Sequence, residues 1–247
     1  QMIEQKKFGI IIEARTNSKR FKNKILKKIY KNYSVLDYIL KKLKTQKIIK
    51  NIVVATTTKK NDAVICNICK KRKIDFFRGS ENDLIKRVAD AAKQKKIEHI
   101  IQLTSDNPFV DMKILKKLVK IYSIGRYDFV TNCLKRSFPI GSDIRIFSLT
   151  KLLQTKNKVK GSNKQHTCHY FLKNFKKMRY FNLVGKKSLF RPNYRLTLDY
   201  PEDLKLFKII FKRLKNKVNL KSAIKFLDKN PDLVKINMNK KDPKYWI

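Results

Sequence analysis

The sequence contains few cysteines, few acidic residues and no long apolar run, and these scarcities exclude several classes of protein. Four cysteines in 247 residues are too few for a disulfide scaffold. Cys66 and Cys69 have the spacing C-x-x-C, but no second pair completes a zinc site, so buried packing within a predicted helix is the better interpretation. A Lys or Arg interrupts every apolar run before it reaches the roughly 20 residues of a membrane span, which predicts a soluble protein.

The sequence pattern predicts neither a secretory signal nor a flexible linker. Residues 1–12 pass from charged residues straight into an apolar run, without the small-residue cleavage site of a signal peptide. No repeat and no Ser- or Gly-rich linker divides the chain. A length of 247 residues with 42% hydrophobic content is enough for the core of one α/β domain, so we expect a single cytosolic domain over residues 1–247.

Acidic residues number only 19 against 61 Lys and Arg, so the formal net charge is +42. A charge of this size usually indicates a nucleic-acid partner. Here, however, 49 of the basic residues are Lys and only 12 are Arg, and they are spread through every predicted helix. Ile, Asn, Phe and Tyr, which share A- and T-rich codons with Lys, are also abundant. A genome with biased base composition therefore explains the charge. Nucleic-acid binding is the alternative, and Arg residues interleaved with aromatic residues would favour it.

Short apolar runs alternate with helical patterns through the first half of the chain. Ser34, followed three residues later by Asp37, predicts a helix cap, and apolar residues recur at helical spacing from Leu36 to Leu43. Alternation of this kind predicts a mostly parallel sheet with helices on both faces. The predicted strands cover residues 8–14, 51–56, 74–77, 98–103 and 128–132, and the further predicted helices cover residues 62–71, 81–95 and 112–122.

The regular alternation stops near residue 135. We interpret residues 135–193 as an inserted subdomain that leaves the core sheet, with a strand-like stretch at 143–147 and a helix near 166–174. Residues 195–199 then predict a strand that closes the sheet. Pro201 follows at the first position of a predicted helix, where its missing N–H costs nothing.

Ligands of open α/β sheets collect at the carboxyl ends of the strands, so the segments that follow the strands are the candidate site. The segment after the first strand, residues 14–24, carries two Arg and three Lys but has no glycine-rich phosphate-binding pattern. Arg15 and Arg20 offer forked donors and Lys24 a point charge, which together suit a triphosphate. A solvated basic loop is the alternative.

Aspartates follow two further predicted strands. Asp106 follows the buried run at 100–103, and Asp199 ends the run at 195–199. Mg²⁺ commonly takes one or two carboxylates and completes its coordination with water and substrate phosphate, a role that Asp106 fits. Asp111 is predicted to cap the following helix, and capping of the helix at Pro201 is the alternative for Asp199.

These segments together resemble the cytidylyltransferases that make CMP-sialic acid and CMP-KDO, and most of all the spore-coat polysaccharide branch of that family. The basic loop matches the signature I-x-A-R-x-x-S-x-R-x-x-x-K-x-L. Further similarity, in the same order, lies at residues 53–56, 77–83, 104–111, 138–147 and 196–204, so the resemblance spans most of the chain. The matched residues of the signature are Ile12, Ala14, Arg15, Ser18, Arg20, Lys24 and Leu26.

The resemblance implies a nucleotide-diphospho-sugar transferase fold that binds CTP, Mg²⁺ and an anionic sugar, in a homodimer built partly through residues 135–193. It implies that Arg15, Lys24 and Asp106 are catalytic and that Asp106 and Asp199 carry Mg²⁺. The acceptor is expected near Arg136, Arg145, Gln165 and His166. The residues implied to contact the nucleotide are Ala14, Arg15, Ser18, Arg20, Lys24, Ala55, Thr56, Arg78, Thr104 and Asp106.

The sequence also departs from the family pattern. Residues 21–23 read Phe-Lys-Asn where Leu-Pro-Gly is usual, and Asn tolerates the left-handed backbone that Gly adopts. Arg145 and Gln165 stand where spore-coat relatives usually have Glu. These exchanges indicate a different or more anionic acceptor, or a catalytically silent homologue. His166 and His169 lie in the predicted helix without a third ligand, so packing or sugar contact is the better interpretation for them than metal binding.

Overall fold

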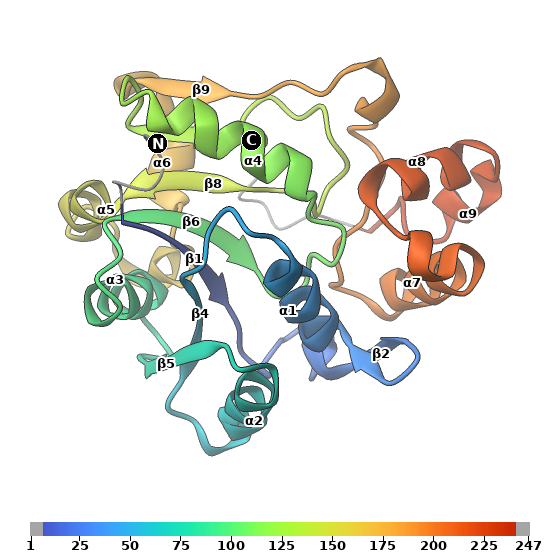
Figure 1. Ribbon diagram of the computed structural model, residues 1–247, viewed down its shortest axis with the longest axis horizontal. Coiled ribbons are helices and arrows are strands. Elements are labelled where there is room, and N and C mark those ends of the chain that lie inside the picture. The colour runs from blue at the N-terminus through green and yellow to red at the C-terminus, as the bar shows by residue number, and fades with distance from the viewer. Residues whose placement is uncertain (1–6, 241–247) are drawn as a thin grey trace.

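A computed structural model of the chain describes residues 7–240. Its centre is a seven-stranded sheet in the order β5-β4-β1-β6-β8-β7-β9 (Figure 1). The strands are β1 (Phe8–Glu13), β4 (Ile52–Thr57), β5 (Asp75–Gly79), β6 (His99–Thr104), β7 (Phe129–Thr131), β8 (Arg145–Ser148) and β9 (Tyr180–Asn182). β8 runs antiparallel to β6 and β7, and the other neighbouring pairs are parallel, so the predicted α/β class is confirmed.

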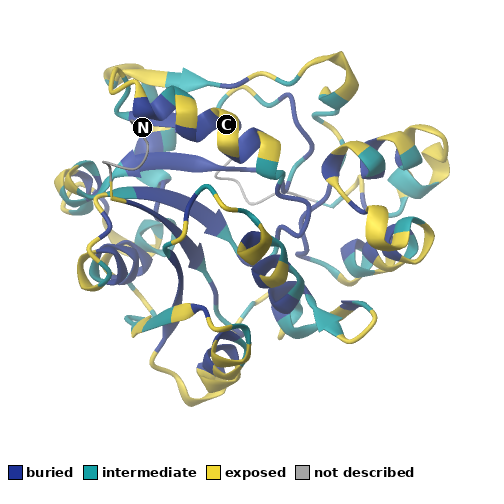
Figure 2. Ribbon diagram, viewed as in Figure 1, coloured by how far each residue is buried: buried dark blue, intermediate teal, exposed yellow. Residues whose placement is uncertain are grey.

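The helices cover both faces of the sheet (Figure 2). Side chains of a strand alternate between faces, so Ile10 and Ile12 of β1 join one core cluster while Ile11 joins the other. The helices packed into the first cluster are α1 (Val35–Thr45), α2 (Ala63–Arg72), α4 (Met112–Ser123), α7 (Pro201–Leu214) and α8 (Leu220–Asp228), and those packed into the second are α3 (Leu84–Gln94), α5 (Leu149–Lys156) and α6 (His169–Asn174).

Local signals place the helix starts as predicted. The Ser34 Oγ accepts a hydrogen bond from the Asp37 N–H at 3.2 Å, and Asp111 accepts from the first turn of α4. Pro201 occupies the first turn of α7. Cys66 and Cys69 are free and buried on α2, which confirms packing as their role.

Two expectations about the second half are wrong. Residues 135–193 do not leave the sheet entirely, because β8 and β9 are strands of it. Residues 195–199 form no strand: a single bridge joins Arg195 to Ile140, and the Leu198 N–H donates to the Asp106 carbonyl at 3.0 Å. The segment therefore hydrogen-bonds to loops, and this pairing brings Asp199 beside Asp106.

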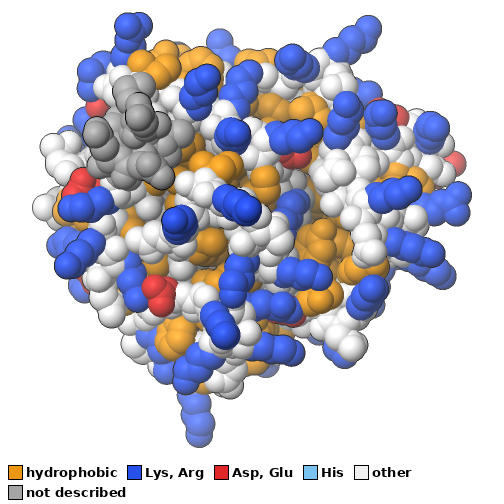
Figure 3. Space-filling view, in the orientation of Figure 1, with side chains coloured by type: hydrophobic (Ala, Val, Ile, Leu, Met, Phe, Trp, Pro, Cys, Tyr) orange, Lys and Arg blue, Asp and Glu red, His pale blue; other side chains and the backbone are white. Residues whose placement is uncertain are grey.

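The remaining elements are short. A hairpin of β2 (Lys28–Tyr30) and β3 (Tyr33–Ser34) precedes α1, and α9 (Pro231–Lys235) follows α8. Among residues 7–240, no helix has the length and apolar character that a bilayer crossing requires. Lys and Arg side chains are distributed over the whole visible face of the molecule and do not gather in one stripe there (Figure 3).

Candidate active site

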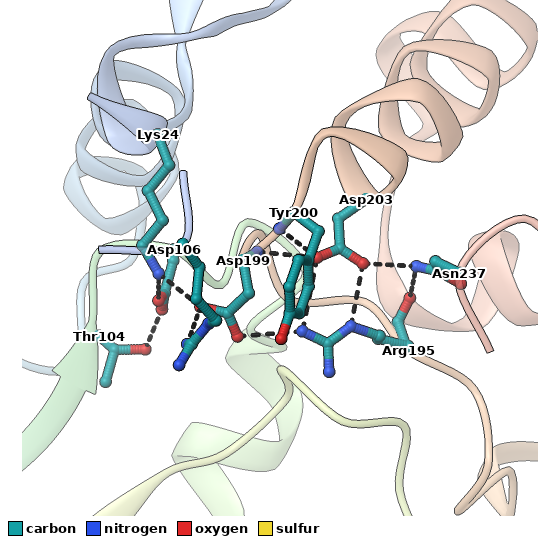
Figure 4. A network of polar contacts seen from close by, with 9 residues as sticks. Lys24, Thr104, Asp106, Arg195, Asp199, Tyr200, Asp203 and Asn237 are labelled. Atoms are coloured by element: carbon teal, nitrogen blue, oxygen red, sulfur yellow. Dashed lines mark hydrogen bonds and ion pairs between the residues drawn. The ribbon is translucent and has the colours of Figure 1, made fainter. Parts of the chain in front are cut away.

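Three loops meet around the side chain of Lys24, at the carboxyl ends of β1 and β6 (Figure 4). Lys24 begins a short 3-10 helix (Lys24–Leu26) at the end of the basic loop. Its Nζ donates to the Asp106 Oδ2 at 2.5 Å and to the Asp199 Oδ1 at 2.8 Å. The two carboxylates therefore converge on one cationic side chain, the ammonium of Lys24.

Asp106 and Asp199 are held from behind by further hydrogen bonds. The Thr104 Oγ1 donates to the Asp106 Oδ1 at 2.6 Å, and the Arg195 Nη2 donates to the Asp199 Oδ2 at 3.0 Å. Asp203 accepts from the backbone N–H groups of Asp199 and Tyr200, at 2.8 and 2.9 Å. The N-cap position of α7 belongs to Tyr200, so the alternative of Asp199 as the cap is wrong.

The charges of this cluster stabilise one another. Burial alone would raise the pKa of Asp199, but Lys24 and Arg20 lower that pKa to about 2. Burial lowers the pKa of Lys24, and Asp106 and Asp199 more than reverse this, so its pKa is raised above the ordinary value. Arg20 Nη2 lies 2.5 Å from the Asp199 Oδ1. Asp199 and Lys24 are therefore both ionised at neutral pH.

The two carboxylates fit a divalent cation that brings its own additional ligands. Residues 7–240 contain no group of three or more His, Cys, Asp or Glu side chains that would hold a metal alone. Mg²⁺ commonly needs no such cage, because water and substrate phosphates complete its shell around one or two carboxylates. The ammonium of Lys24 lies at the point on which both carboxylates converge, and a metal at that point would have to displace it.

The basic loop is anchored by a buried aspartate. The backbone N–H and the Oγ1 of Thr16 donate to the Asp62 Oδ1 at 2.7 and 2.6 Å, and the Thr57 Oγ1 donates to the other carboxylate oxygen. The Thr16 carbonyl accepts from the N–H groups of Ser18 and Asn23. Asn23 has a φ of 55°, so it adopts the left-handed backbone inferred for this position.

Asp62 was missed by sequence reasoning, because it lies at the start of a predicted helix and looks like a cap. Its distance of 46 residues from Thr16 in the sequence leaves no local signal for the contact.

Four of the residues implied to contact the nucleotide are buried or hold the scaffold in this structure, namely Ala14, Ala55, Thr56 and Arg78. Ala55 and Thr56 are fully buried in β4, so in this conformation they offer no surface to a ligand. Arg78 donates to the carbonyls of Thr57, Thr58 and Lys59, at distances from 2.9 to 3.0 Å, and so holds the loop after β4. The loop residues Arg15, Ser18 and Arg20 keep partly exposed or exposed side chains.

Arg145 does not face a pocket or the solvent. It is 3% exposed, with Nη2 at 3.1 Å from the Asp143 Oδ2 and Nη1 at 3.0 Å from the Gln102 Oε1. Arg136 contacts the other oxygen of Asp143 at 3.1 Å. The prediction that Arg145 lines the acceptor pocket is therefore wrong for this conformation, because a buried carboxylate already neutralises it.

Gln165 and His166 do lie beside the basic loop. The Arg15 Nη1 donates to the Gln165 Oε1 at 2.6 Å. His166 follows a 3-10 turn (Gly161–Gln165) and precedes α6, so its predicted place within the helix is wrong. Burial is the largest cause that lowers the pKa of His166, and together with the charges of His169, Arg15, Arg145 and Arg20 it brings that pKa to about 4. His166 is therefore neutral at neutral pH.

Two carboxylates thus converge on a lysine beside a basic loop, at the carboxyl edge of a mostly parallel sheet, which is where open α/β sheets bind their ligands. The chain belongs to the cytidylyltransferase family, whose sequence profile matches residues 9–235. This confirms the enzyme class that the loop signature implied.

Similar proteins are found over nearly the whole chain. An uncharacterized protein of Methanocaldococcus jannaschii is 33% identical over 237 residues, which are 95% of this chain and 96% of that protein. The spore coat polysaccharide biosynthesis protein SpsF of Bacillus subtilis is 28% identical over 233 residues, 90% of this chain and 94% of that protein.

Solved structures of similar fold include cytidylyltransferases. A cytidylyltransferase from Leptospira borgpetersenii superposes with a TM-score of 0.87 and 34% identity, over 96% of this chain and 99% of that one. The CMP:2-keto-3-deoxy-manno-octonic acid synthetase in complex with CTP has a TM-score of 0.62 at 13% identity, over 84% of this chain and 99% of that one. At that identity the second likeness shows the fold alone, and this fold is the one predicted.

Proposed function

We propose that this enzyme transfers CMP from CTP to an acidic sugar or sugar phosphate, with Mg²⁺ and with release of pyrophosphate, for the synthesis of surface polysaccharide or glycoconjugate. The observation that carries the proposal is the convergence of Asp106 and Asp199 on the ammonium of Lys24, directly beside Arg20. Carboxylates that meet on one cation suit a metal that bridges protein and phosphate, and the adjacent cations suit the phosphates themselves.

Asp106 and Asp199 would hold Mg²⁺, which when bound supplies positive charge at the triphosphate oxygens. Lys24 and Arg20 already lie at this point, and Arg15 extends from the start of the same loop. These cations stabilise the negative charge that accumulates on the leaving pyrophosphate as an acceptor oxygen attacks the α-phosphorus in line. Most of the rate enhancement then comes from position and charge, since no covalent intermediate with the protein is needed.

An anionic acceptor is supported by the charges around His166. Burial is the main cause of the lowered pKa of His166, and Arg15, Arg145 and Arg20 lower it further, so these three cations lie close enough to His166 to attract an anion. The solved CMP:2-keto-3-deoxy-manno-octonic acid synthetase and the spore-coat relative supply the sugar and polysaccharide parts of the proposal by analogy.

The proposal includes a cytoplasmic homodimer in which residues 135–193 contribute to acceptor binding and to the interface. Sedimentation equilibrium of the full chain tests the oligomeric state. A monomer at enzymatically active concentrations would remove the dimer from the proposal.

The direct test is pyrophosphate release across the four nucleoside triphosphates and a panel of acidic sugars, with and without Mg²⁺. We expect release only with Mg²⁺ and an acidic sugar, and fastest with CTP. The Asp199→Asn variant is the matched negative control, because it removes a charge and almost no volume. Release that is independent of the sugar, or equal for all four nucleotides, would contradict the proposal.

A further inference from the structure

Gln165 connects the basic loop to a second loop, whose contacted residues lie 83 and 84 positions before it in the sequence. Its Oε1 accepts from Arg15 Nη1 at 2.6 Å. Its Nε2 donates to the Asn82 carbonyl at 3.0 Å and to the Glu81 carbonyl at 3.4 Å. A residue of the inserted segment therefore determines where the guanidinium of Arg15 is held.

The amide of Gln165 supplies both the acceptor and the donors that these contacts require. A guanidinium donates and never accepts, whereas a backbone carbonyl accepts and never donates. The amide oxygen of Gln165 must therefore face Arg15 and its nitrogen must face the two carbonyls, which fixes the orientation of the amide. A carboxylate at this position would still bind Arg15, but it would turn negative oxygens toward the carbonyls of Glu81 and Asn82.

The amide also leaves the charge of Arg15 uncompensated. Of the arginines around His166, Arg20 is paired with Asp199 and Arg145 with Asp143. Within residues 7–240, Arg15 has no carboxylate within the 4.0 Å of an ion pair.

The acids of the neighbouring loop are engaged elsewhere. Glu81 pairs with Lys59 at 3.1 Å and Asp83 with Lys164 at 3.8 Å. The acidic side chains that lie nearest to Gln165 in the loop it contacts are therefore held by lysines and leave Arg15 to a ligand.

We propose that Gln165 is a positioning residue that orients Arg15 without neutralising it, so that the full charge of Arg15 recognises a polyphosphate group. The inference rests on the proposed function only in placing a polyphosphate beside Arg15. It assigns to Gln165 a role in phosphate recognition, in place of the acceptor contact that the resemblance implied.

The test measures the affinity for inorganic pyrophosphate by calorimetry in the wild type and in three variants. Gln165→Glu adds a neutralising charge, Gln165→Ala removes only the tether, and Gln154→Glu makes the same charge change at an exposed residue of α5. We expect affinity to fall about tenfold in Gln165→Glu and about threefold in Gln165→Ala, and to stay unchanged in Gln154→Glu. Because the extra loss in Gln165→Glu is electrostatic, it should shrink as salt is raised.

Three results would overturn the inference. The first is that Gln165→Ala binds pyrophosphate as tightly as the wild type does, and the second is that Gln165→Glu and Gln154→Glu bind it equally well. The third is that salt does not reduce the difference in pyrophosphate affinity between Gln165→Glu and Gln165→Ala. Thermal unfolding shows that each variant is folded, and Gln165→Ala alone still decides the tether if Gln165→Glu does not fold. Pyrophosphate binding can be measured without turnover. An enzyme that fails to transfer CMP would therefore contradict the proposed function, whereas the pyrophosphate affinities of the variants would still test the role of Gln165.

Discussion

Replacing Lys24 with Met is the perturbation that most sharply separates the charge of this side chain from its volume. Lys24 is 12% exposed at its side chain, and it lies between Asp199, which is 7% exposed, and Asp106, which is 20% exposed. Removing one partner of a buried pair costs about 3 to 5 kcal/mol, because it leaves an uncompensated charge. In Lys24→Met, Asp199 keeps its ion pairs with Arg20 and Arg195. The free energy of unfolding should therefore fall by about 2 to 3 kcal/mol, at or below the lower end of that range.

The assay is denaturant unfolding with and without Mg²⁺. In the wild type Mg²⁺ must displace the ammonium of Lys24, so it should add less than about 1 kcal/mol to the free energy of unfolding. In Lys24→Met the carboxylates have lost that cation, and Mg²⁺ should restore about 2 kcal/mol. Lys22→Met, at an exposed residue of the same loop, is the control.

This prediction is contradicted if Lys24→Met is as stable as Lys22→Met in the absence of metal. It would also be refuted if Mg²⁺ stabilised the wild type and Lys24→Met equally, because Lys24 would then not compete with the metal for Asp106 and Asp199.

Three further predictions follow from the same contacts. Asp106→Asn and Asp199→Asn should each lower Mg²⁺-dependent turnover by at least about 100-fold with the circular dichroism spectrum unchanged, and normal turnover in both would remove the metal assignment. Burial and neighbouring cations lower the pKa of His166 to about 4 in the folded state. The neutral imidazole therefore stabilises the fold fully above the pKa that His166 has in the unfolded chain, and this stabilisation is lost as the pH falls toward 4. Between about pH 7 and pH 5 the wild type should therefore lose about 2 kcal/mol more than His166→Gln, and parallel stability profiles would show that His166 is not shielded from protons. Arg145→Gln should destabilise the fold by about 3 kcal/mol, because among residues 7–240 Asp143 then keeps only its ion pair with Arg136. The KM for the acceptor should stay unchanged, and a raised acceptor KM would show that Arg145 lines the acceptor pocket after all.

The fold was largely predictable because its signals are local. Ser34 and Pro201 mark helix starts by their own chemistry, and apolar periodicity separates strands from helices over residues 8–132. Residues 195–199 misled because Leu196 and Leu198 are both fully buried and alternate like a strand, although their partners are loops. β9 has only 3 residues, which is too short for a recognisable pattern.

The sequence placed Lys24, Asp106 and Asp199 in one candidate site, and the structure brings their side chains together, although the strand expected before Asp199 does not form. It was not predictable where function depends on contacts between distant segments. Asp62 anchors Thr16 from another β-α unit. Asp143 and Arg145 are close in the sequence, but Asp143 lies in the irregular segment before β8, so no local pattern predicts the ion pair between them. Charge read from sequence identifies a candidate residue, but only the fold shows whether a neighbour has already neutralised it.

The most direct test of the account is to follow labelled CTP in a reaction with Mg²⁺ and an acidic sugar. Label on the α-phosphorus should move into a nucleotide-sugar product, and label on the γ-phosphorus should appear only in pyrophosphate. Both transfers should disappear in Asp199→Asn, because the carboxylate that Lys24 and Arg20 hold in place is gone. Recovery of the α-label as free CMP, or of the γ-label as orthophosphate or on the sugar, would contradict nucleotidyl transfer as the activity of this enzyme.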